Sequence, residues 1–352
     1  MTGRIEVNIN RLKEIIEHFD KTYVLVIGDF MLDKFIQGTV SRISPEAPVP
    51  VIDVTSEIFR PGGAANAISN ISALGGNAVA VGVIGDDWNG RKLISLLKQD
   101  GVDTECIIVS KERPTTVKTR IIAEQQQIVR IDREKRDALE YEYTKTILDF
   151  LNEKINDVDA ILISDYDKGM VTNGLLEGLI PLAKKFDKPV VVHPKVAHFL
   201  DYKGVTIVNS NIERASIVTG ISQIHETSIR NMGQWLLTQL ECEYVLITRG
   251  NDGMSLFERS GGITHIPAAV NEVYDVVGVG AGDTVTSVIA LSLASGVTNM
   301  VNSAILANIA AGILVGKQGS ATVTRDELKQ TFLQAKSFTK KGLFRDSELE
   351  FV

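Results

Sequence analysis

A glycine-rich stretch in the last third of the chain has residue types that can stabilise a negatively charged reacting group. Residues 278–284 read Gly-Val-Gly-Ala-Gly-Asp-Thr, and an apolar run from Val285 to Leu293 follows. If this run is a helix, the free backbone N–H groups at its start favour an anion, and an acid there can take a proton from an attacking hydroxyl group. The expected site is Asp283 with an anion hole formed by Gly280, Ala281 and Gly282. A plain helix-capping role for Asp283 is the alternative.

Two other glycine-rich fingerprints do not fit the stretch. A Walker A loop ends in Gly-Lys followed by Ser or Thr, which the sequence lacks. A dinucleotide fingerprint has its third glycine three places after the second, whereas Gly282 follows Gly280 by two. The pattern therefore disfavours a P-loop enzyme and a dehydrogenase.

A second glycine pair lies early in the chain. Residues 60–66 read Arg-Pro-Gly-Gly-Ala-Ala-Asn and lead into a helix-like segment that ends near Leu74. Adjacent glycines before a helix allow a ligand to approach the backbone, and Asn66 places an amide one turn in. A glycine turn with close helix packing is the structural alternative.

Acidic residues follow the first expected strand, from Tyr23 to Ile27. Asp29 and Asp33 lie just beyond its carboxyl end, where open parallel sheets bind ligands. Helix capping or turn hydrogen bonding is the competing interpretation, chiefly for Asp29.

Strand-like and helix-like segments alternate after about residue 134. Expected strands cover residues 160–163, 189–192, 206–208 and 244–247; expected helices cover 141–154, 173–186, 227–239 and 300–315. This alternation predicts an α/β fold with a mostly parallel sheet and helices on both faces. Polar groups follow each strand, including a Thr-Arg-Gly-Asn-Asp-Gly turn at 248–253 that by itself is more typical of a hairpin than of a phosphate site.

Two segments have a different pattern. Residues of about 35–60 and 112–132 show β-type alternation, and prolines exclude long helices from the first. We expect them to form a small β-sheet lid on a single domain of residues 1–352. Such a lid leaves an apolar face that needs cover, which suggests closure over substrate or a homodimer.

Overall composition excludes several classes of protein. A net charge of -7 argues against a nucleic-acid partner, and no apolar run of about 18 residues predicts a membrane span. Cys106 and Cys242 form neither a disulfide framework nor a metal motif, so a cytoplasmic location is expected. Residues 1–20 do not have the pattern of a signal peptide. His193 and His198 lack further zinc ligands nearby.

Together these motifs resemble the ribokinase-like (PfkB) carbohydrate kinases, in which a three-layer α/β/α domain carries a β lid. The resemblance runs from about Val24 to Leu328. It is most specific to the heptose-7-phosphate kinases of ADP-heptose synthesis for lipopolysaccharide, through residues 26–33, 41–50, 60–66, 164–169 and 307–317. The nucleotidyltransferase half that accompanies such kinases, with its His-x-Gly-His motif, has no counterpart in the sequence.

The resemblance implies roles for particular residues. ATP with Mg²⁺ is the expected phosphate donor and a sugar phosphate the acceptor, while the metal ligands are unassigned. The implied sugar-binding residues are Asp33, Gly62, Gly63 and Asn66, with Lys118, Arg120 and Arg130 as candidate cations for the sugar's phosphate, alongside Arg42 and Arg60. The implied nucleotide-binding residues are Lys195, Asn211, Thr248, Gly250, Gly253 and Asn308. Solvated strand charges are the alternative for at least half of these cations.

Three positions depart from the family pattern. His193 replaces the acid of an Asp-Pro-Lys motif, Arg214 replaces the glutamate of an Asn-x-x-Glu motif, and residues 275–283 are two longer than Asp-Val-Thr-Gly-Ala-Gly-Asp. Three hypotheses stay open: a heptose 7-phosphate kinase, a kinase for another sugar, and a catalytically weakened homologue with a binding role.

Overall fold

The computed structural model describes residues 8–124, 126–269, 280–317 and 322–338, and the structural statements below concern these residues. Their centre is a nine-stranded sheet in the order β13-β12-β11-β10-β9-β8-β1-β4-β5, parallel from β11 to β5 and with antiparallel pairing of β12 to its two neighbours. Its strands are β1 (Tyr23–Gly28), β4 (Asn77–Gly85), β5 (Asp103–Ser110), β8 (Ala160–Ser164), β9 (Val190–His193), β10 (Ile207–Asn211), β11 (Tyr244–Thr248), β12 (Met254–Glu258) and β13 (Ile263–Ile266).

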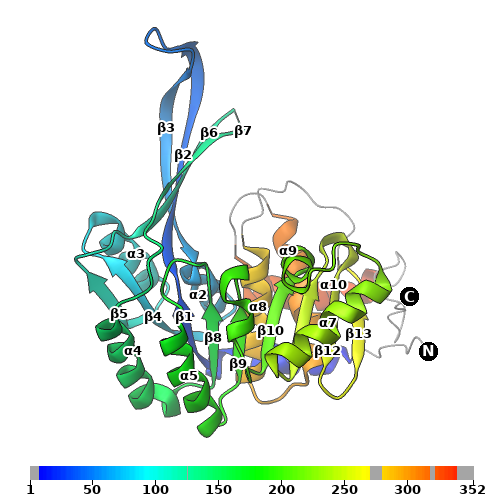
Figure 1. The fold of residues 1–352 in the computed structure, drawn as a ribbon. Helices are drawn as coiled ribbons and strands as arrows, with labels where there is room; N and C mark the ends of the chain where they lie inside the picture. Colours follow the sequence, from blue (N-terminus) through cyan, green and yellow to red (C-terminus); the bar gives the residue numbers. More distant parts are fainter. Residues whose placement is uncertain (1–7, 125, 270–279, 318–321, 339–352) are drawn as a thin grey trace.

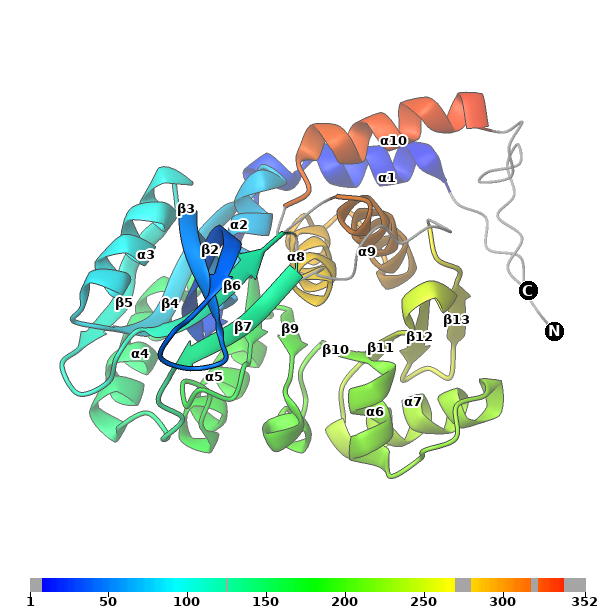
Figure 2. The ribbon, with the colours of Figure 1, turned by 90° about the horizontal axis from the view of Figure 1, so that it is seen from above.

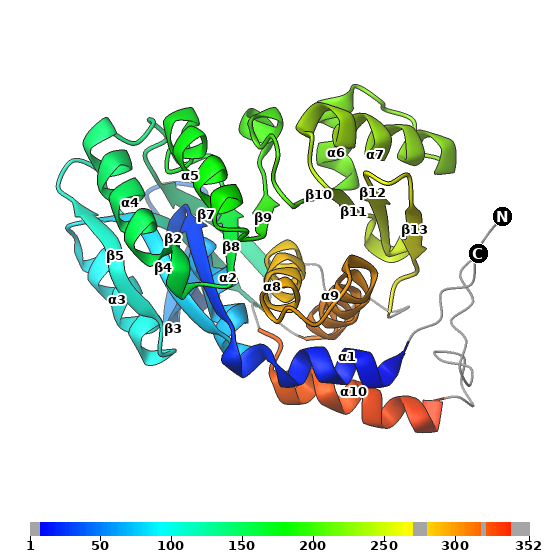
Figure 3. The ribbon, with the colours of Figure 1, turned by 90° about the horizontal axis from the view of Figure 1, so that it is seen from below.

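Helices cover both faces of this sheet (Figure 1). The helices are α1 (Ile9–Glu17), α2 (Ala64–Ala73), α3 (Trp88–Gln99), α4 (Tyr141–Lys154), α5 (Asn173–Lys185), α6 (Ile212–Thr219), α7 (Glu226–Leu240), α8 (Ala281–Ala294), α9 (Met300–Val315) and α10 (Arg325–Phe338). Short 3-10 helices span Phe19–Lys21, Ile155–Asp157, Val196–Asp201 and Gly250–Asp252. The first and last helices, α1 and α10, lie side by side along one edge of the molecule (Figures 2 and 3).

The alternation of side chains along each strand explains why the sheet is covered twice. In β1, Val24 and Val26 pack into one hydrophobic cluster, with α2, α8 and α9, while Leu25 and Ile27 pack into a second, with α4, α5 and α7. Strands that are apolar on both faces are expected in a parallel sheet between two helical layers. The predicted three-layer α/β/α architecture is therefore confirmed.

Helix α8 is the most enclosed helix among the described residues. Every residue from Asp283 to Ser292 is buried, because α8 lies between the sheet, α2 and α9. A helix buried on all sides cannot shift without disrupting several interfaces. Its N-terminus is consequently a fixed point of the structure.

The lid is a separate four-stranded sheet that projects from the body (Figure 1). Its strands are β2 (Phe30–Ile43), β3 (Pro50–Gly63), β6 (Thr116–Ala123) and β7 (Gln126–Arg133), in the order β3-β2-β6-β7. Pro45, Pro48 and Pro50 suggested that this segment is broken into short pieces, but β2 and β3 are 14 residues each. Pro45 and Pro48 lie in the connection between the two strands and Pro50 begins β3, so none of them interrupts the pairing of β3 with β2.

Candidate active site

Asp283 lies in the first turn of α8, at the carboxyl edge of the sheet. Only 2% of the residue is exposed. Its Oδ2 accepts a hydrogen bond from the Asn66 amide at 2.8 Å, and its Oδ1 accepts one from the Tyr166 hydroxyl at 2.6 Å. Two donors from different elements therefore fix the orientation of this carboxylate.

A row of polar contacts joins α8 to α2 beneath Asp283. After the Asn66 contact, the hydroxyl of Thr284 donates to Asn70 Oδ1 at 2.8 Å, and that of Ser287 donates to the carbonyl of Ala67 at 3.0 Å. These contacts are almost completely buried, where such hydrogen bonds are costly to break. They set the relative position of the two helices that carry Asn66 and Asp283.

The backbone before Asp283 has no room for larger residues. Gly280 has φ of 117°, and a Cβ atom there would lie 2.6 Å from the amide nitrogen of Asn66. A Cβ atom on Gly282 would lie 2.7 Å from the ring of His193. The helix starts without a side-chain cap, so the N–H groups of its first turn remain available to an anion.

His193 and the two cations Lys195 and Arg214 form a cluster beside Asp283. His193 Nε2 lies 2.7 Å from Nη1 of Arg214, and its Nδ1 lies 3.4 Å from Asp283 Oδ1. Burial lowers the pKa of His193, and the positive charges of Arg214 and Lys195 lower it further, although Asp283 opposes them. Because Arg214 can only donate, the imidazole is neutral and carries its proton on Nδ1.

Tyr166 connects the cluster to Asp283. The Nζ atom of Lys195 lies 4.5 Å from the centre of the Tyr166 ring, while the Tyr166 hydroxyl donates to Asp283. Burial raises the pKa of Tyr166 well above its ordinary value, and the charge on Asp283 adds to the shift. Tyr166 therefore stays protonated and remains a donor.

Asp33 lies on the lid side of the site. Its carboxylate accepts a hydrogen bond from Nη1 of Arg120 at 2.5 Å, and both side chains are only 6% exposed. A Cβ atom on Gly62 would lie 2.5 Å from Asp33 Oδ2, and Gly63 has φ of 58°. The glycine pair is thus needed both for space beside Asp33 and for the sharp entry into α2.

Four basic residues share one face of the lid with Asp33. In the strand register, Arg60 and Lys118 each lie opposite Asp33, and Arg130 lies opposite Arg120. We call Arg60, Lys118, Arg120 and Arg130 the lid cations. Several have acidic partners: Lys118 binds Asp132 at 3.0 Å and Glu134 at 3.5 Å, and Arg130 binds Asp132 at 2.9 Å. Arg42, the remaining basic residue suggested for the sugar's phosphate, is exposed farther out on β2.

Two buried acids have structural roles that the sequence left open or did not reveal. Asp29 accepts hydrogen bonds from the backbone N–H groups of Tyr166, Lys168 and Met170, which agrees with turn hydrogen bonding. Burial raises its pKa to about 6, with a contribution from Asp165. Asp165 in turn accepts from the Tyr202 hydroxyl at 2.8 Å. These contacts position the loop that carries Tyr166.

The expected nucleotide-binding residues lie along adjacent strand ends. Lys195 follows β9, Asn211 ends β10 and caps α6 by accepting from Arg214 N, and Thr248 ends β11. Asn308 of α9 donates to the carbonyl of Pro267 beyond β13. Gly250 and Gly253 belong to the hairpin between β11 and β12, and a Cβ atom on Gly253 would lie 2.0 Å from a backbone carbonyl, so this glycine is required by the turn.

The expected residues thus divide into two groups around Asp283, one on the lid and α2 and one on β9, β10, β11 and α9. Tyr166, His193 and Arg214 complete the site, although the sequence assigned Tyr166 no role. Its place in the Ser-Asp-Tyr-Asp-Lys-Gly motif after β8 was the available signal. The lengthened loop at 275–283 lies outside the described residues up to position 279.

Within the described parts of the chain, no group of three His, Cys, Asp or Glu side chains is arranged to hold a metal ion. The same residues include no helix long and apolar enough to cross a membrane.

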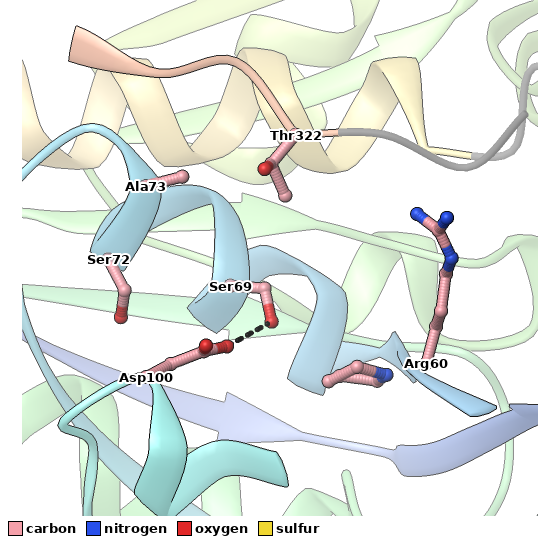
Figure 4. Close-up of a pocket in the computed structure, with 7 residues that line it drawn as sticks. Arg60, Ser69, Ser72, Ala73, Asp100 and Thr322 are labelled. Atoms are coloured by element: carbon pink, nitrogen blue, oxygen red, sulfur yellow. Dashed lines mark hydrogen bonds between the residues drawn. The ribbon is translucent and has the colours of Figure 1, made fainter. Parts of the chain in front are cut away.

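A cavity of about 360 Å³ lies on another face of α2 (Figure 4). Ser69, Ser72 and Ala73 of α2 border it, together with Arg60, Asp100 and Thr322, and Ser69 donates to Asp100 at 3.2 Å. Asp283 does not line this cavity, which is therefore distinct from the arrangement around α8.

Comparison with curated proteins finds close relatives over most of the chain. The bifunctional protein HldE of Geobacter metallireducens is 44% identical over 317 residues, which are 90% of this chain and 64% of the relative. HldE of Syntrophotalea carbinolica is 38% identical over 97% of this chain and 68% of the relative. The chain thus spans less than two thirds of the first of these relatives.

Solved structures with the same fold are more distant in sequence. An Arabidopsis thaliana ribokinase complexed with ribose and ATP matches with a TM-score of 0.69 and 17% identity, covering 88% of this chain and 98% of that one. Escherichia coli phosphofructokinase-2 in complex with potassium matches with a TM-score of 0.72 and 20% identity, covering 90% and 99%. The pfkB family carbohydrate kinase model matches residues 21–327. With a fixed carboxylate at the N-terminus of α8, a ribokinase-like fold and this match over most of its length, the chain belongs to the pfkB family of carbohydrate kinases.

Proposed function

We propose that the chain is an ATP-dependent kinase that phosphorylates the anomeric hydroxyl of D-glycero-D-manno-heptose 7-phosphate, giving the 1,7-bisphosphate for ADP-heptose synthesis. The observation that carries the proposal is the position of Asp283, held by Asn66 and Tyr166 at the start of α8, in a chain 44% identical to an HldE protein over 90% of its length. The resemblance of residues 41–50 to heptose kinases supports the choice of sugar.

In the proposed reaction, Asp283 accepts the proton of the sugar hydroxyl as its oxygen attacks the γ-phosphorus of ATP. The new phosphorus–oxygen bond forms, the bond from the γ-phosphorus to the β–γ bridging oxygen breaks, and ADP leaves with that electron pair. The free N–H groups of Ala281 and Gly282 stabilise the charge on the transferred group. Most of the rate enhancement comes from positioning and electrostatics.

The lid side of the site fits a sugar that carries a phosphate. Asp33 and Asn66 can bind sugar hydroxyls, with Gly62 and Gly63 leaving space for close approach. The lid cations lie on the same face as Asp33, so they are placed to bind the distal phosphate. Lys118, Arg120 and Arg130 already bind carboxylates in the described structure, so a bound phosphate competes with these acids for them.

The residues present do not fit a magnesium site built by the protein at this position. Arg214 and Lys195 lie on the side of Asp283 where the nucleotide is proposed to bind, which we call the donor side. The described residues offer no carboxylate cluster there. No step of the proposed reaction is therefore assigned to Mg²⁺.

Other parts of the proposal concern the protein as a whole. We expect a single cytoplasmic domain that forms a homodimer through the lid. Val129 and Ile131 alternate with Arg130, so they lie on the lid face opposite the lid cations, and they are 44% and 54% exposed. Such an apolar strand face favours pairing with a second copy.

The substrate is tested by incubating the purified chain with ATP and a panel of sugars and sugar phosphates. The expected result is that heptose 7-phosphate is phosphorylated with the highest kcat/KM and that the product is the 1,7-bisphosphate, identified by phosphorus NMR. Turnover of another sugar, with heptose 7-phosphate unchanged, would reject this substrate and favour a different kinase of the same family.

A second candidate function is ligand binding with little or no turnover. His193 and Arg214 favour it, because they place a neutral ring and a cation where the family pattern has acids. This function predicts that ATP and sugar phosphate raise the melting temperature without product formation. Robust turnover that is abolished in Asp283→Asn would exclude it.

A further inference from the structure

The basic residues on the two sides of Asp283 differ in whether they are paired with a carboxylate. In the described residues, Arg214 and Lys195 have no carboxylate within ion-pair distance, whereas Arg120 and Lys118 on the lid do. Arg214 donates through Nη1 to His193 Nε2 and, at 3.2 Å, to the carbonyl of Pro194. Its Nε and Nη2 groups have no hydrogen-bond partner in the same part of the chain. The positive charge of these two side chains is therefore not balanced by a carboxylate within ion-pair distance in the described residues.

His193 holds Arg214 against the start of α8. The imidazole is only 7% exposed and packs against Gly282, where an added Cβ atom would lie 3.0 Å from Nε2. The nitrogen that accepts from Arg214 is thus next to the first turn of α8. His193 Nδ1 is buried and makes no hydrogen bond of good geometry in the described structure. A buried donor without a partner indicates that a ligand or a shift of Asp283 completes the site.

Lys195 supplies the second charge beside the ring of Tyr166, which packs edge-on against the imidazole. Burial lowers its pKa to about 8, and the neighbouring Arg214 contributes to that shift. Two cations that repel each other are stabilised by an anion between them, and a phosphate chain offers several oxygen atoms to both. The helix N-terminus adds free N–H groups to the same space.

We infer that Arg214 and Lys195 bind the phosphates of the nucleotide directly, with His193 as a positioning residue that orients Arg214. This inference rests on the proposed function for the assignment of ATP as the donor. Its consequence is that the chain binds ATP without a divalent cation, because side chains already neutralise part of the phosphate charge. The phosphate of the sugar substrate is the other group that these cations can bind. A binding experiment with each ligand separates the two possibilities.

The experiment measures binding of ATP, and separately of mannose 6-phosphate, by isothermal titration calorimetry in excess EDTA. We compare the wild-type chain with Arg214→Gln and with Arg11→Gln, a matched control on α1 whose arginine pairs with Glu14 at the surface. Loss of a charge-assisted contact should weaken ATP binding by about 10- to 100-fold in Arg214→Gln and leave it unchanged in Arg11→Gln. Mannose 6-phosphate binding should not change in either variant.

The role of His193 is tested with a measurement that a general packing defect would not change selectively. His193→Ala should weaken ATP binding in EDTA without changing mannose 6-phosphate binding, and His193→Gln, which restores an acceptor, should recover part of the loss. Arg214→Lys should fall between wild type and Arg214→Gln. If Arg214→Gln does not fold, as judged by its melting temperature, Arg214→Lys decides the question alone.

Three outcomes would overturn the inference: ATP binding in EDTA that is equal in wild type and Arg214→Gln, wild-type ATP binding that requires Mg²⁺, or loss confined to mannose 6-phosphate. Failure of the proposed function looks different. In that case heptose 7-phosphate is not phosphorylated, while ATP binding in EDTA still depends on Arg214.

Discussion

The lid side and the donor side of Asp283 both contain basic residues, but they balance charge differently. On the lid side, Arg120 is paired with Asp33 and both are buried, while Lys118 is paired with Asp132 and Glu134. On the donor side, Lys195 and Arg214 contact an aromatic ring, an imidazole and a carbonyl instead of acids.

The difference separates charges that stabilise the fold from charges that are available to a ligand. A buried ion pair is satisfied without substrate, so removing one member leaves the other stranded. A cation without an acid is costly until an anion arrives, so its contribution appears in binding. The following changes test that division.

The largest effect should follow from Asp283→Asn, which removes the proposed proton acceptor between the two sides. Because a positioned general base contributes about 10²- to 10⁴-fold, kcat should fall by about a thousandfold, while the amide can keep a contact to Tyr166 or Asn66. Steady-state kinetics measure this effect, and Asp149→Asn, an exposed position on α4, is the matched control. A variant that retains a tenth of wild-type kcat would show that Asp283 is not the base.

Breaking the buried pair should reduce stability more than removing an unpaired cation. Arg120→Met leaves the Asp33 carboxylate buried without its partner, so the free energy of unfolding should fall by about 3–5 kcal/mol. Lys195→Met should change it by less than about 1 kcal/mol, because a cation that is costly to bury is removed. Urea unfolding measures both, and equal losses would contradict the division of charges. Asp33→Asn combined with Arg120→Met should recover part of the loss.

Tyr166 contacts Asp283 through its hydroxyl and Lys195 through its ring, so the hydroxyl should affect catalysis more than nucleotide binding. Tyr166→Phe removes the donor to Asp283 Oδ1 but keeps the ring beside Lys195. We expect kcat to fall about tenfold, as one hydrogen bond to a charged group is lost, with KM for ATP unchanged. A parallel rise in KM would show that the hydroxyl acts on the donor side.

The smallest effect concerns pH. In the unliganded protein, burial and Arg214 lower the pKa of Lys195 to about 8, so its charge is present at pH 7 and mostly lost at pH 9. ATP affinity in EDTA should therefore fall as pH rises through 8. The expected loss is about fivefold between pH 7 and 9, since bound phosphate raises the pKa and offsets part of a tenfold change.

Lys195→Arg tests the source of this pH dependence, because arginine keeps its charge throughout the range. ATP affinity in that variant should be flat between pH 7 and 9. If the fivefold loss persists, another group titrates.

The sequence predicted the architecture because strand and helix periods are local properties of the chain. Helices 141–154 and 300–315 agree with α4 and α9 in full, and the strand at 244–247 is one residue shorter than β11. The length of the lid strands was missed, since prolines at the ends of a strand and within it look alike until the partner strand is known.

The site was predicted in part. Asp283 and Asn66 were found from glycine-rich motifs, and Asp33 was found from its place just beyond the first expected strand. Sequence alone did not show that Tyr166 donates to Asp283 or that His193 accepts from Arg214, because these contacts join residues that are 117 and 21 positions apart. The sequence alone also did not show which lid cations pair with acids, because the pairing depends on the register between strands.

The direct passage of β3 into α2 has a mechanical consequence. Gly63 ends β3, Ala64 begins α2 with its N–H donating to the Asp29 carbonyl at 3.0 Å, and Asn66 lies within the first turn. No flexible linker separates the long arm of the lid from the amide that holds Asp283. A displacement of β3 relative to the central sheet would therefore move Asn66, and with it the amide that orients the Asp283 carboxylate.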